Sequence, residues 1–217
     1  MLESKKHVFW QALLLTILFF VLGLVFGVYL EQLRSENFNN DFYQSEISLY
    51  DSLAITKLSE GGFISCTDMR QVNVDFADKI YAEARNLDKL EEKSQLTESL
   101  KTIHRKYDLL RTILWMNIID VNKKCQNTDT IVYLYTYNTE DLKIKSEQVV
   151  WSKILGDVKE RNGNEVVLIP IAVDTDLTSL DILLKKFGVE KYPAVIINEK
   201  QVLYDLESAE NIEKYLE

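Results

Sequence analysis

Hydrophobic and polar positions follow three different patterns along the chain. Residues 8–30 contain no charged side chain, and only Gln11 and Thr16 are notably polar. A helix rises about 1.5 Å per residue, so this segment is long enough to cross the roughly 30 Å hydrocarbon layer of a membrane. Residues 31–125 have helical periodicity, and residues 130–217 alternate strand-length apolar runs with helical patterns. The pattern predicts a transmembrane helix, a helical region and an α/β domain.

The apolar segment is predicted to be an uncleaved signal anchor. It is longer than the apolar part of a cleaved signal peptide, and residues 31–34, EQLR, offer no small-x-small cleavage site. The other alternative is a buried helix of a soluble fold, but such helices are rarely apolar on every face. Lys5 and Lys6 precede the segment and a net negative flank follows it, so residues 1–7 should remain in the cytoplasm. We expect a single-pass protein of the cell membrane with an extracytoplasmic C-terminal domain.

Gly23 and Gly27 form a G-x-x-x-G pair inside the apolar segment. Small residues at this spacing let two membrane helices approach closely, so the pair is a candidate helix–helix contact for a homodimer. The same spacing also occurs often by chance. The bilayer is the expected partner of this segment in either case.

The helical region is predicted to contain an antiparallel hairpin. Apolar residues form one stripe in residues 68–92 and another in residues 96–121, and the connection between these two helices is short. A preceding helix is expected to end at Gly61 and Gly62.

Cys66 and Cys125 lie just before and just after this hairpin, and the chain has no other cysteine. Antiparallel packing brings them to the same end of the hairpin. A disulfide there would close a loop of about 60 residues and contribute on the order of 2 to 4 kcal/mol. An extracytoplasmic location permits its oxidation. Two free buried thiols and a redox-active pair are the alternatives.

Charge and composition argue against several classes of function. A net charge of −9 and a pI of about 4.9 are unsuited to nucleic-acid binding, which requires clustered lysine and arginine. The two histidines, His7 and His104, are far apart in the sequence, so no metal site is predicted, and His104 is expected on the surface. No phosphate-binding loop or catalytic triad spacing is present, and no cofactor is expected.

The last part of the chain is predicted to have the element order βαβαββα. Apolar runs rich in β-branched residues mark the strands, and 3.6-residue periodicity marks the helices between them. The predicted strands are residues 131–137, 166–173, 194–197 and 201–205, and the second and third helices are residues 177–187 and 208–216.

The segment LLKKFGVEKYPAVIIN, Leu183 to Asn198, is the most specific part of this pattern. Gly188 is placed to end a helix, and Pro193 stands at the first residue of a strand, where a missing N–H is tolerated. The segment resembles the thioredoxin-like family, whose members carry a Gly-Val or Gly-Ile pair after a helix and then a cis-proline that opens the third strand. The resemblance covers about residues 130–216 and implies a thioredoxin-like α/β fold.

The resemblance also indicates where the catalytic cysteines of the family would lie, and this chain lacks them. Active members of the family carry a Cys-x-x-Cys pair at the start of the first helix, and the positions that correspond here are Thr139 and Leu142. Neither residue can form a thiolate, so no dithiol reaction is expected there. Thr139 is instead predicted to cap the helix. The resemblance further implies that Tyr192, Pro193 and Thr139 line a groove in which extended peptides bind through their backbone.

These observations predict a single-pass membrane protein that presents a helical hairpin and a redox-inactive thioredoxin-like domain outside the cytoplasm. Its function is predicted to be protein or peptide binding, or scaffolding, rather than catalysis. The alternative is a thiol-disulfide oxidoreductase, or a redox partner of one, that uses Cys66 and Cys125. A third hypothesis is a structural one, in which the helices form a membrane-proximal stalk that dimerises through Gly23 and Gly27.

Overall fold

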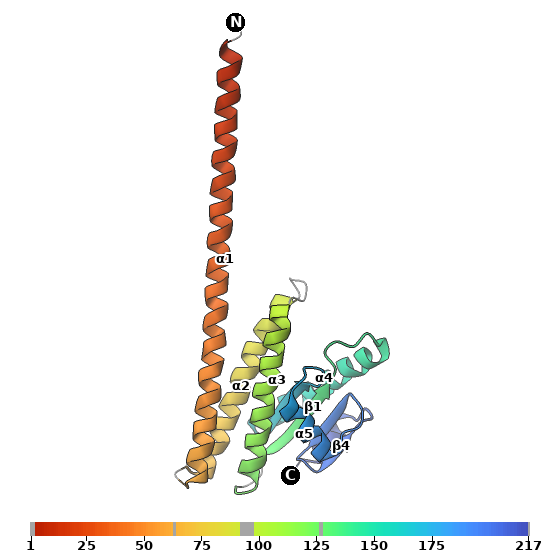
Figure 1. Cartoon of the computed structure of the whole chain (residues 1–217). Helices are drawn as coiled ribbons and strands as arrows, with labels where there is room; N and C mark the ends of the chain where they lie inside the picture. The colour runs from red at the N-terminus through yellow and green to blue at the C-terminus, as the bar shows by residue number, and fades with distance from the viewer. Residues whose placement is uncertain (1–2, 63, 92–97, 126–127, 217) are drawn as a thin grey trace. The chain divides into compact units, whose positions relative to one another are not determined.

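The computed structural model describes residues 3–62, 64–91, 98–125 and 128–216, and it divides into two units, residues 1–47 and 48–217 (Figure 1). Helix α1 runs from Glu3 to Glu60 and is followed by a turn at Gly61 and Gly62. The helix expected before these glycines is therefore the continuation of the apolar one.

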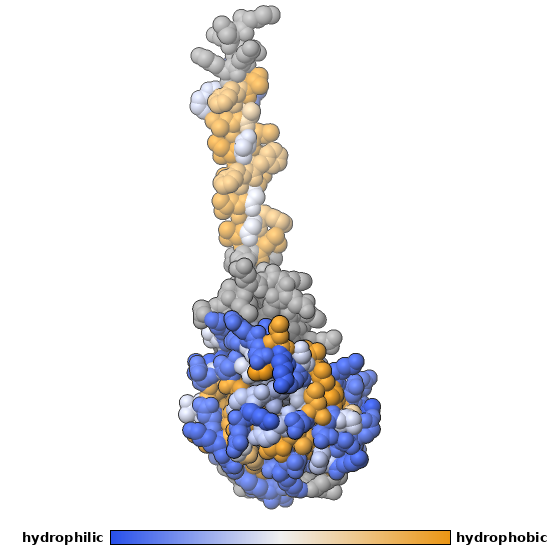
Figure 2. Space-filling view, turned by 90° about the vertical axis from the view of Figure 1, so that its right-hand side faces the viewer, coloured by the Kyte–Doolittle hydropathy of each residue, from blue (hydrophilic) through white to orange (hydrophobic). Residues whose placement is uncertain are grey.

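The apolar part of α1, His7–Leu30, has the length and composition that a membrane crossing requires. Every side chain in this segment is exposed. Figure 2 shows this hydrophobic surface on the side of the helix that faces the viewer. Such a helix exposes apolar area to water on all its faces, which is unfavourable unless another apolar medium covers it.

Two further helices form an antiparallel hairpin, α2 from Cys66 to Glu91 and α3 from Glu98 to Asn122. The predicted hairpin and its boundaries are confirmed to within two residues, and residues 93–95 of the predicted connection lie outside the described residues. Helix α2 begins after Ser65, whose hydroxyl accepts from the N–H of Asp68 at 3.2 Å and donates to its carboxylate at 2.6 Å. Each helix buries one apolar stripe, namely Met69, Phe76, Ile80 and Ala84 in α2 and Ile103, Tyr107, Leu110, Leu114 and Ile118 in α3.

The rest of the chain forms a four-stranded mixed sheet with the order β2-β1-β3-β4. Strand β1 is parallel to β2 and antiparallel to β3, and β3 is antiparallel to β4. The mixed α/β class predicted for this region is thus confirmed. The strands are β1 Asp129–Tyr135, β2 Val166–Ala172, β3 Ala194–Ile197 and β4 Gln201–Leu203.

Helices cover both faces of this sheet. Successive residues of a strand point to opposite faces. Ile131 and Val195 pack on one face in a core with Trp151 and Leu155 of α4 (Leu142–Asn162) and with Ile212 of α6 (Ala209–Glu213). The alternate strand residues are equally buried, on the other face. There α3 packs against β2 and contacts α5 (Thr178–Phe187), where the rings of Trp115 and Phe187 stack at 5.0 Å.

Strand β2 is an edge strand, and its free edge is partly protected. Pro170 has no N–H to offer, and the N–H of Ala172 donates to the carboxylate of Asp108 in α3 at 3.1 Å. The ammonium of Lys159 donates to the carbonyl of Val166 at 2.9 Å. These contacts leave fewer main-chain groups with which another strand could pair.

Strand β1 ends two residues earlier than predicted, at Tyr135. The amide of Gln148 in α4 accepts from the N–H of Thr136 at 3.0 Å and donates to its carbonyl at 3.1 Å. The N–H of Tyr137 donates to Asp174 at 2.8 Å. Side chains thus take the backbone groups that a longer strand would need.

Candidate functional site

The loop before α4 and the first residue of that helix contain the two positions at which the resemblance would place cysteines. Asp141 is the N-cap of α4, because its carboxylate accepts from the N–H groups of Lys143 at 2.8 Å and Ile144 at 3.4 Å. The prediction that Thr139 caps this helix is therefore wrong; its hydroxyl accepts from the N–H of Asp141 at 3.3 Å. The carboxylate is the better cap here because it also carries a negative charge at the positive end of the helix dipole. Leu142 opens the helix with 77% of its surface exposed.

The connector from α5 to β3 is held by Tyr204, which follows β4. Gly188 ends α5 in the left-handed conformation at φ 64°, which glycine adopts without a steric penalty. The hydroxyl of Tyr204 donates to the carbonyl of Gly188 at 3.3 Å and accepts from the N–H of Glu190 at 3.1 Å. The ammonium of Lys191 lies 5.0 Å from the centre of the Tyr204 ring. Tyr204 therefore positions the residues that lead to the cis peptide bond between Tyr192 and Pro193.

Tyr192 and Pro193 line a hollow of about 320 Å³, hereafter the Tyr192 groove. Helix α4 forms the opposite wall with Lys143, Glu147 and Trp151, and the segment after β4 contributes Asp205. Thr139 does not belong to the lining. Lysine and carboxylate side chains of both signs surround the groove, and Lys143 and Glu147 pair at 3.8 Å. The groove therefore has no strong preference for a charged ligand.

Two residues that line this groove carry polar groups without partners. The indole N–H of Trp151 is fully buried and has no hydrogen-bond partner in the part of the chain that the structure describes. Neither main-chain group of Tyr192 bonds to another described residue. Burial raises the pKa of the Tyr192 phenol, and the negative charge of Asp181 raises it further. Tyr192 thus remains a neutral donor at physiological pH.

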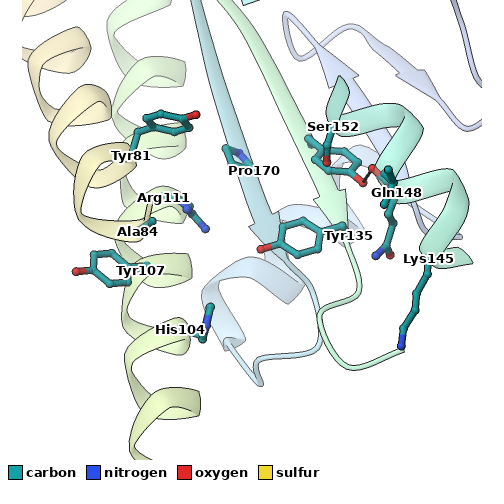
Figure 3. A pocket seen from close by; sticks show the side chains of 12 residues that line it. Tyr81, Ala84, His104, Tyr107, Arg111, Tyr135, Lys145, Gln148, Ser152 and Pro170 are labelled. Carbon is teal, nitrogen blue, oxygen red and sulfur yellow. Dashed lines mark hydrogen bonds between the residues drawn. The ribbon is translucent and has the colours of Figure 1, made fainter. Parts of the chain in front are cut away.

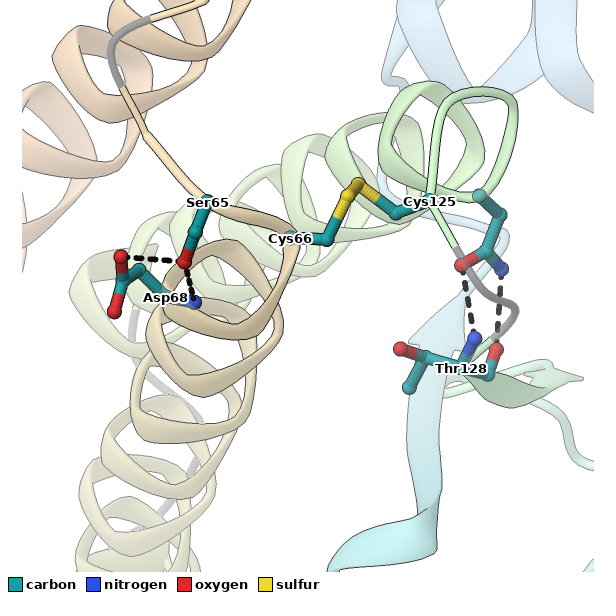
Figure 4. Close-up of a disulfide and its surroundings, with 6 residues drawn as sticks. Ser65, Cys66, Asp68, Cys125 and Thr128 are labelled. Atoms are coloured by element: carbon teal, nitrogen blue, oxygen red, sulfur yellow. Dashed lines mark hydrogen bonds between the residues drawn. A yellow bond between two sulfur atoms is a disulfide. The ribbon is translucent and has the colours of Figure 1, made fainter.

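Cys66 and Cys125 form a disulfide with their Cα atoms 5.5 Å apart, as predicted (Figure 4). It joins the start of α2 to the end of α3. The amide of Asn122, the last residue of α3, accepts from the N–H of Thr128 at 2.9 Å and donates to its carbonyl at 3.1 Å, which attaches the hairpin to the residue before β1. The chain contains two cysteines, so neither is a free thiol.

The disulfide and the Tyr192 groove lie at opposite ends of β1. Pro193 precedes Ala194, which pairs with Leu134 near the end of that strand, whereas the disulfide lies before its start. Strand β1 has seven residues. At about 3.3 Å per residue the two ends of such a strand are roughly 20 Å apart. The disulfide is therefore not part of the groove.

His104 was expected on the surface, and that prediction is wrong. Its side chain is buried, with Nε2 3.0 Å from the hydroxyl of Tyr137 and the two ring centres 4.2 Å apart. Within residues 3–62, 64–91, 98–125 and 128–216 no three His, Cys, Asp or Glu side chains are grouped as a metal site would require.

The remaining predicted site residues are Gly23 and Gly27, which lie on the apolar part of α1. A Cβ atom added at either glycine would meet no atom within 4 Å in the single chain. Sequence reasoning missed Tyr204 and Trp151, since the periodicity of their own segments gives no sign that they meet beside Pro193.

Comparison with known proteins adds no relative from which a function could be transferred. No protein-family model matches the chain, and no curated protein is significantly similar to it.

Proposed function

We propose that this protein is anchored in the membrane by His7–Leu30 and presents a redox-inactive, thioredoxin-like domain that holds extended peptide segments in the Tyr192 groove. The domain lies outside the cytoplasm, and the role of the protein is binding or scaffolding. The observation that carries this proposal is that Tyr192 lines the groove and that neither of its main-chain groups bonds to another described residue.

The order of the strands supports the thioredoxin-like part of the proposal. The family resemblance implies a βαβ unit followed by an antiparallel ββα unit. The four strands and helices α4, α5 and α6 follow that order, and Pro193 opens β3. Thr139 and Leu142 stand in place of the family's two cysteines, and neither side chain can exchange a disulfide.

Main-chain recognition follows from the groups in the groove. An extended peptide laid beside Tyr192 would accept from its N–H and donate to its carbonyl, as in strand addition. The mixed charges of Lys143, Glu147 and Asp205 favour peptides of little net charge.

The membrane anchor and its orientation rest on separate observations. The exposed apolar surface of His7–Leu30 needs an apolar medium, and Lys5 and Lys6 favour a cytoplasmic N-terminus. A disulfide persists in oxidising compartments, which agrees with an extracytoplasmic hairpin. Homodimerisation through Gly23 and Gly27 remains part of the proposal for the membrane segment.

A peptide array probed with the full-length protein in lipid nanodiscs tests this function, with empty nanodiscs as the blank. We expect the wild type to bind a subset of uncharged, β-prone peptides and Tyr192→Ala to lose most of that binding. Tyr50→Ala is the matched control, since Tyr50 is an exposed tyrosine of α1 that does not line the groove. Equal binding by wild type and Tyr192→Ala would show that the groove is not the peptide site.

A further inference from the structure

A second and separate cavity, of about 820 Å³, lies where the hairpin meets the edge of the sheet (Figure 3). Helix α3 contributes His104, Tyr107 and Arg111, strand β1 contributes Tyr135, and α4 contributes Lys145. None of these residues lines the Tyr192 groove. We call this space the hairpin cavity.

Aromatic rings form much of its wall. Tyr81, Tyr107, Tyr133 and Tyr135 all line it, and the last two stack with ring centres 5.5 Å apart. The hydroxyl of Tyr107 donates to Glu83 at 3.3 Å, and that of Tyr133 donates to the carbonyl of Gln148 at 3.1 Å. Because these hydroxyls are used within the protein, the rings offer mainly their apolar surface to a ligand.

Among the residues that the structure describes, the charged side chains that line the cavity are all basic. Arg111 and Lys145 are accompanied by His104, and no carboxylate belongs to this described lining. Figure 3 shows Arg111 pointing from α3 into the space between the hairpin and Tyr135. A ligand held there would therefore meet positive charge together with aromatic surface.

Arg111 is the decisive residue because its guanidinium is buried and mostly unpaired. Only 9% of the residue is exposed, and its one hydrogen bond in the described structure runs from Nη1 to Asp108 at 3.3 Å. A guanidinium has several further N–H donors in a planar fork that matches a carboxylate or a phosphate. The unused donors border the cavity, where an anionic ligand can pair with them through charge-assisted hydrogen bonds.

The balance of charge selects the kind of anion. Asp108 lies behind Arg111 and offsets part of its charge, and Lys145 is the other lysine or arginine among the described lining residues. A monoanion is therefore neutralised, whereas a phosphate dianion would be left with excess negative charge in a partly desolvated site.

We propose that the hairpin cavity binds a small organic carboxylate with an aromatic body, with the carboxylate on Arg111 and Lys145 and the body among the tyrosine rings. The site does not depend on the Tyr192 groove or on peptide binding.

Ligand-observed NMR titrations of the full-length protein in nanodiscs test the proposal, with 3-phenylpropanoate as the probe and empty nanodiscs as the blank. The uncharged 3-phenylpropanamide has nearly the same shape and should bind at least about tenfold more weakly, because it lacks the charge-assisted bonds. Equal binding of acid and amide would overturn the proposal. Displacement of the probe by an equal concentration of inorganic phosphate would also overturn it, in favour of a phosphate site.

Variants locate the probe. Lys145→Gln alters an exposed lysine and should weaken binding several-fold, whereas Lys153→Gln, an exposed lysine of the same helix outside the lining, should not. The double variant Arg111→Gln/Asp108→Asn removes both members of the buried pair without leaving an unpaired charge, and it should abolish binding. Circular dichroism checks that the double variant is folded. If the double variant does not fold, the Lys145→Gln variant still tests the site. Unchanged affinity in Lys145→Gln and in a folded double variant would place the probe elsewhere and contradict the proposal.

Discussion

The apolar residues of α1 and those of strand β1 have similar chemistry and opposite surroundings. The large apolar side chains of residues 8–30 are 38% to 70% exposed, whereas Ile131, Val132 and Leu134 are completely buried. The strand is covered by helices on both faces, whereas every side chain of residues 7–30 in the helix is exposed. A helix forms its backbone hydrogen bonds within itself, so it can stand alone in an apolar phase. A strand cannot, because its backbone groups must pair with neighbouring strands.

The difference indicates that the C-terminal domain is stable in water, whereas the apolar part of α1 requires an apolar solvent. Burying apolar surface stabilises a fold by about 25 cal/mol per Å², and the C-terminal domain obtains this by packing. The apolar part of α1 can gain this stabilisation only if an external apolar phase, such as the membrane interior, covers it. We therefore expect substitutions to act on membrane insertion in the first region and on the free energy of unfolding in the second.

The largest effect is expected from charges placed in the apolar helix. Leu18→Arg together with Phe19→Arg should cost about 5 to 7 kcal/mol of insertion free energy, because each arginine at the centre of a membrane helix costs about 2.5 to 3.5 kcal/mol. Alkaline extraction of membranes should then release the variant, while the wild type stays in the pellet. Retention of the variant would contradict the membrane assignment of His7–Leu30.

In the second region the largest single-residue effect is expected in the core. Leu155→Ala should lower the free energy of unfolding by about 2 to 5 kcal/mol, since it empties a buried site against the sheet. Val149→Ala, on the same helix but 69% exposed, should change it by less than about 0.5 kcal/mol. Urea titrations in mild detergent measure both. Similar losses in the two variants would mean that α4 does not pack as described.

The disulfide should contribute somewhat less than the core. Replacing both cysteines in Cys66→Ser/Cys125→Ser should lower the free energy of unfolding by about 2 to 4 kcal/mol. Peptide binding in the Tyr192 groove should be unchanged, because the disulfide lies at the other end of β1. Loss of function without loss of stability would favour the redox alternative over the structural one.

The smallest expected effect concerns Asp108 and its pKa. Burial raises the pKa of this carboxyl from 3.8 to about 6, against the opposing effect of Arg111. The folded state then binds a proton more tightly than the unfolded state, so this carboxyl should lower stability as the pH rises from about 4 to about 6. Relative to Asp108→Asn, the wild type should lose on the order of 1 to 3 kcal/mol across that interval. Urea titrations of both proteins at pH 4.5 and 7.5 measure the difference, and a parallel pH dependence of the two would contradict the raised pKa.

Local patterns in the sequence predicted much of the fold. Helical stripes, the glycine at position 188 and the apolar strand runs are set by neighbouring residues, and the structure confirms the hairpin, the end of α5 and β3. The disulfide was predictable because antiparallel packing fixes where the two ends of a hairpin meet. The N-cap of α4 was not predictable, because Thr139 and Asp141 lie two residues apart and both are good N-cap residues.

The sites depend on residues that are distant in the sequence, and there the prediction was incomplete. Nothing near Tyr204 indicates that its hydroxyl holds the connector before Pro193. Similarly, His104 and Arg111 lie on a helix whose periodicity marks an apolar stripe, and only the packing of that helix against β2 shows that they are buried. Hence part of the Tyr192 groove was predicted from the sequence, whereas the hairpin cavity was not predicted.

The most direct test of the central claim is a backbone N-methyl scan of one array-selected peptide, with affinity for the nanodisc-bound protein measured by fluorescence anisotropy. If the Tyr192 groove binds the main chain, one N-methyl position should weaken binding by about tenfold or more, because it removes the donor to the carbonyl of Tyr192. Replacing the side chain at the same position by alanine should matter less. Affinity that survives N-methylation at every position would contradict main-chain recognition and with it the proposed function.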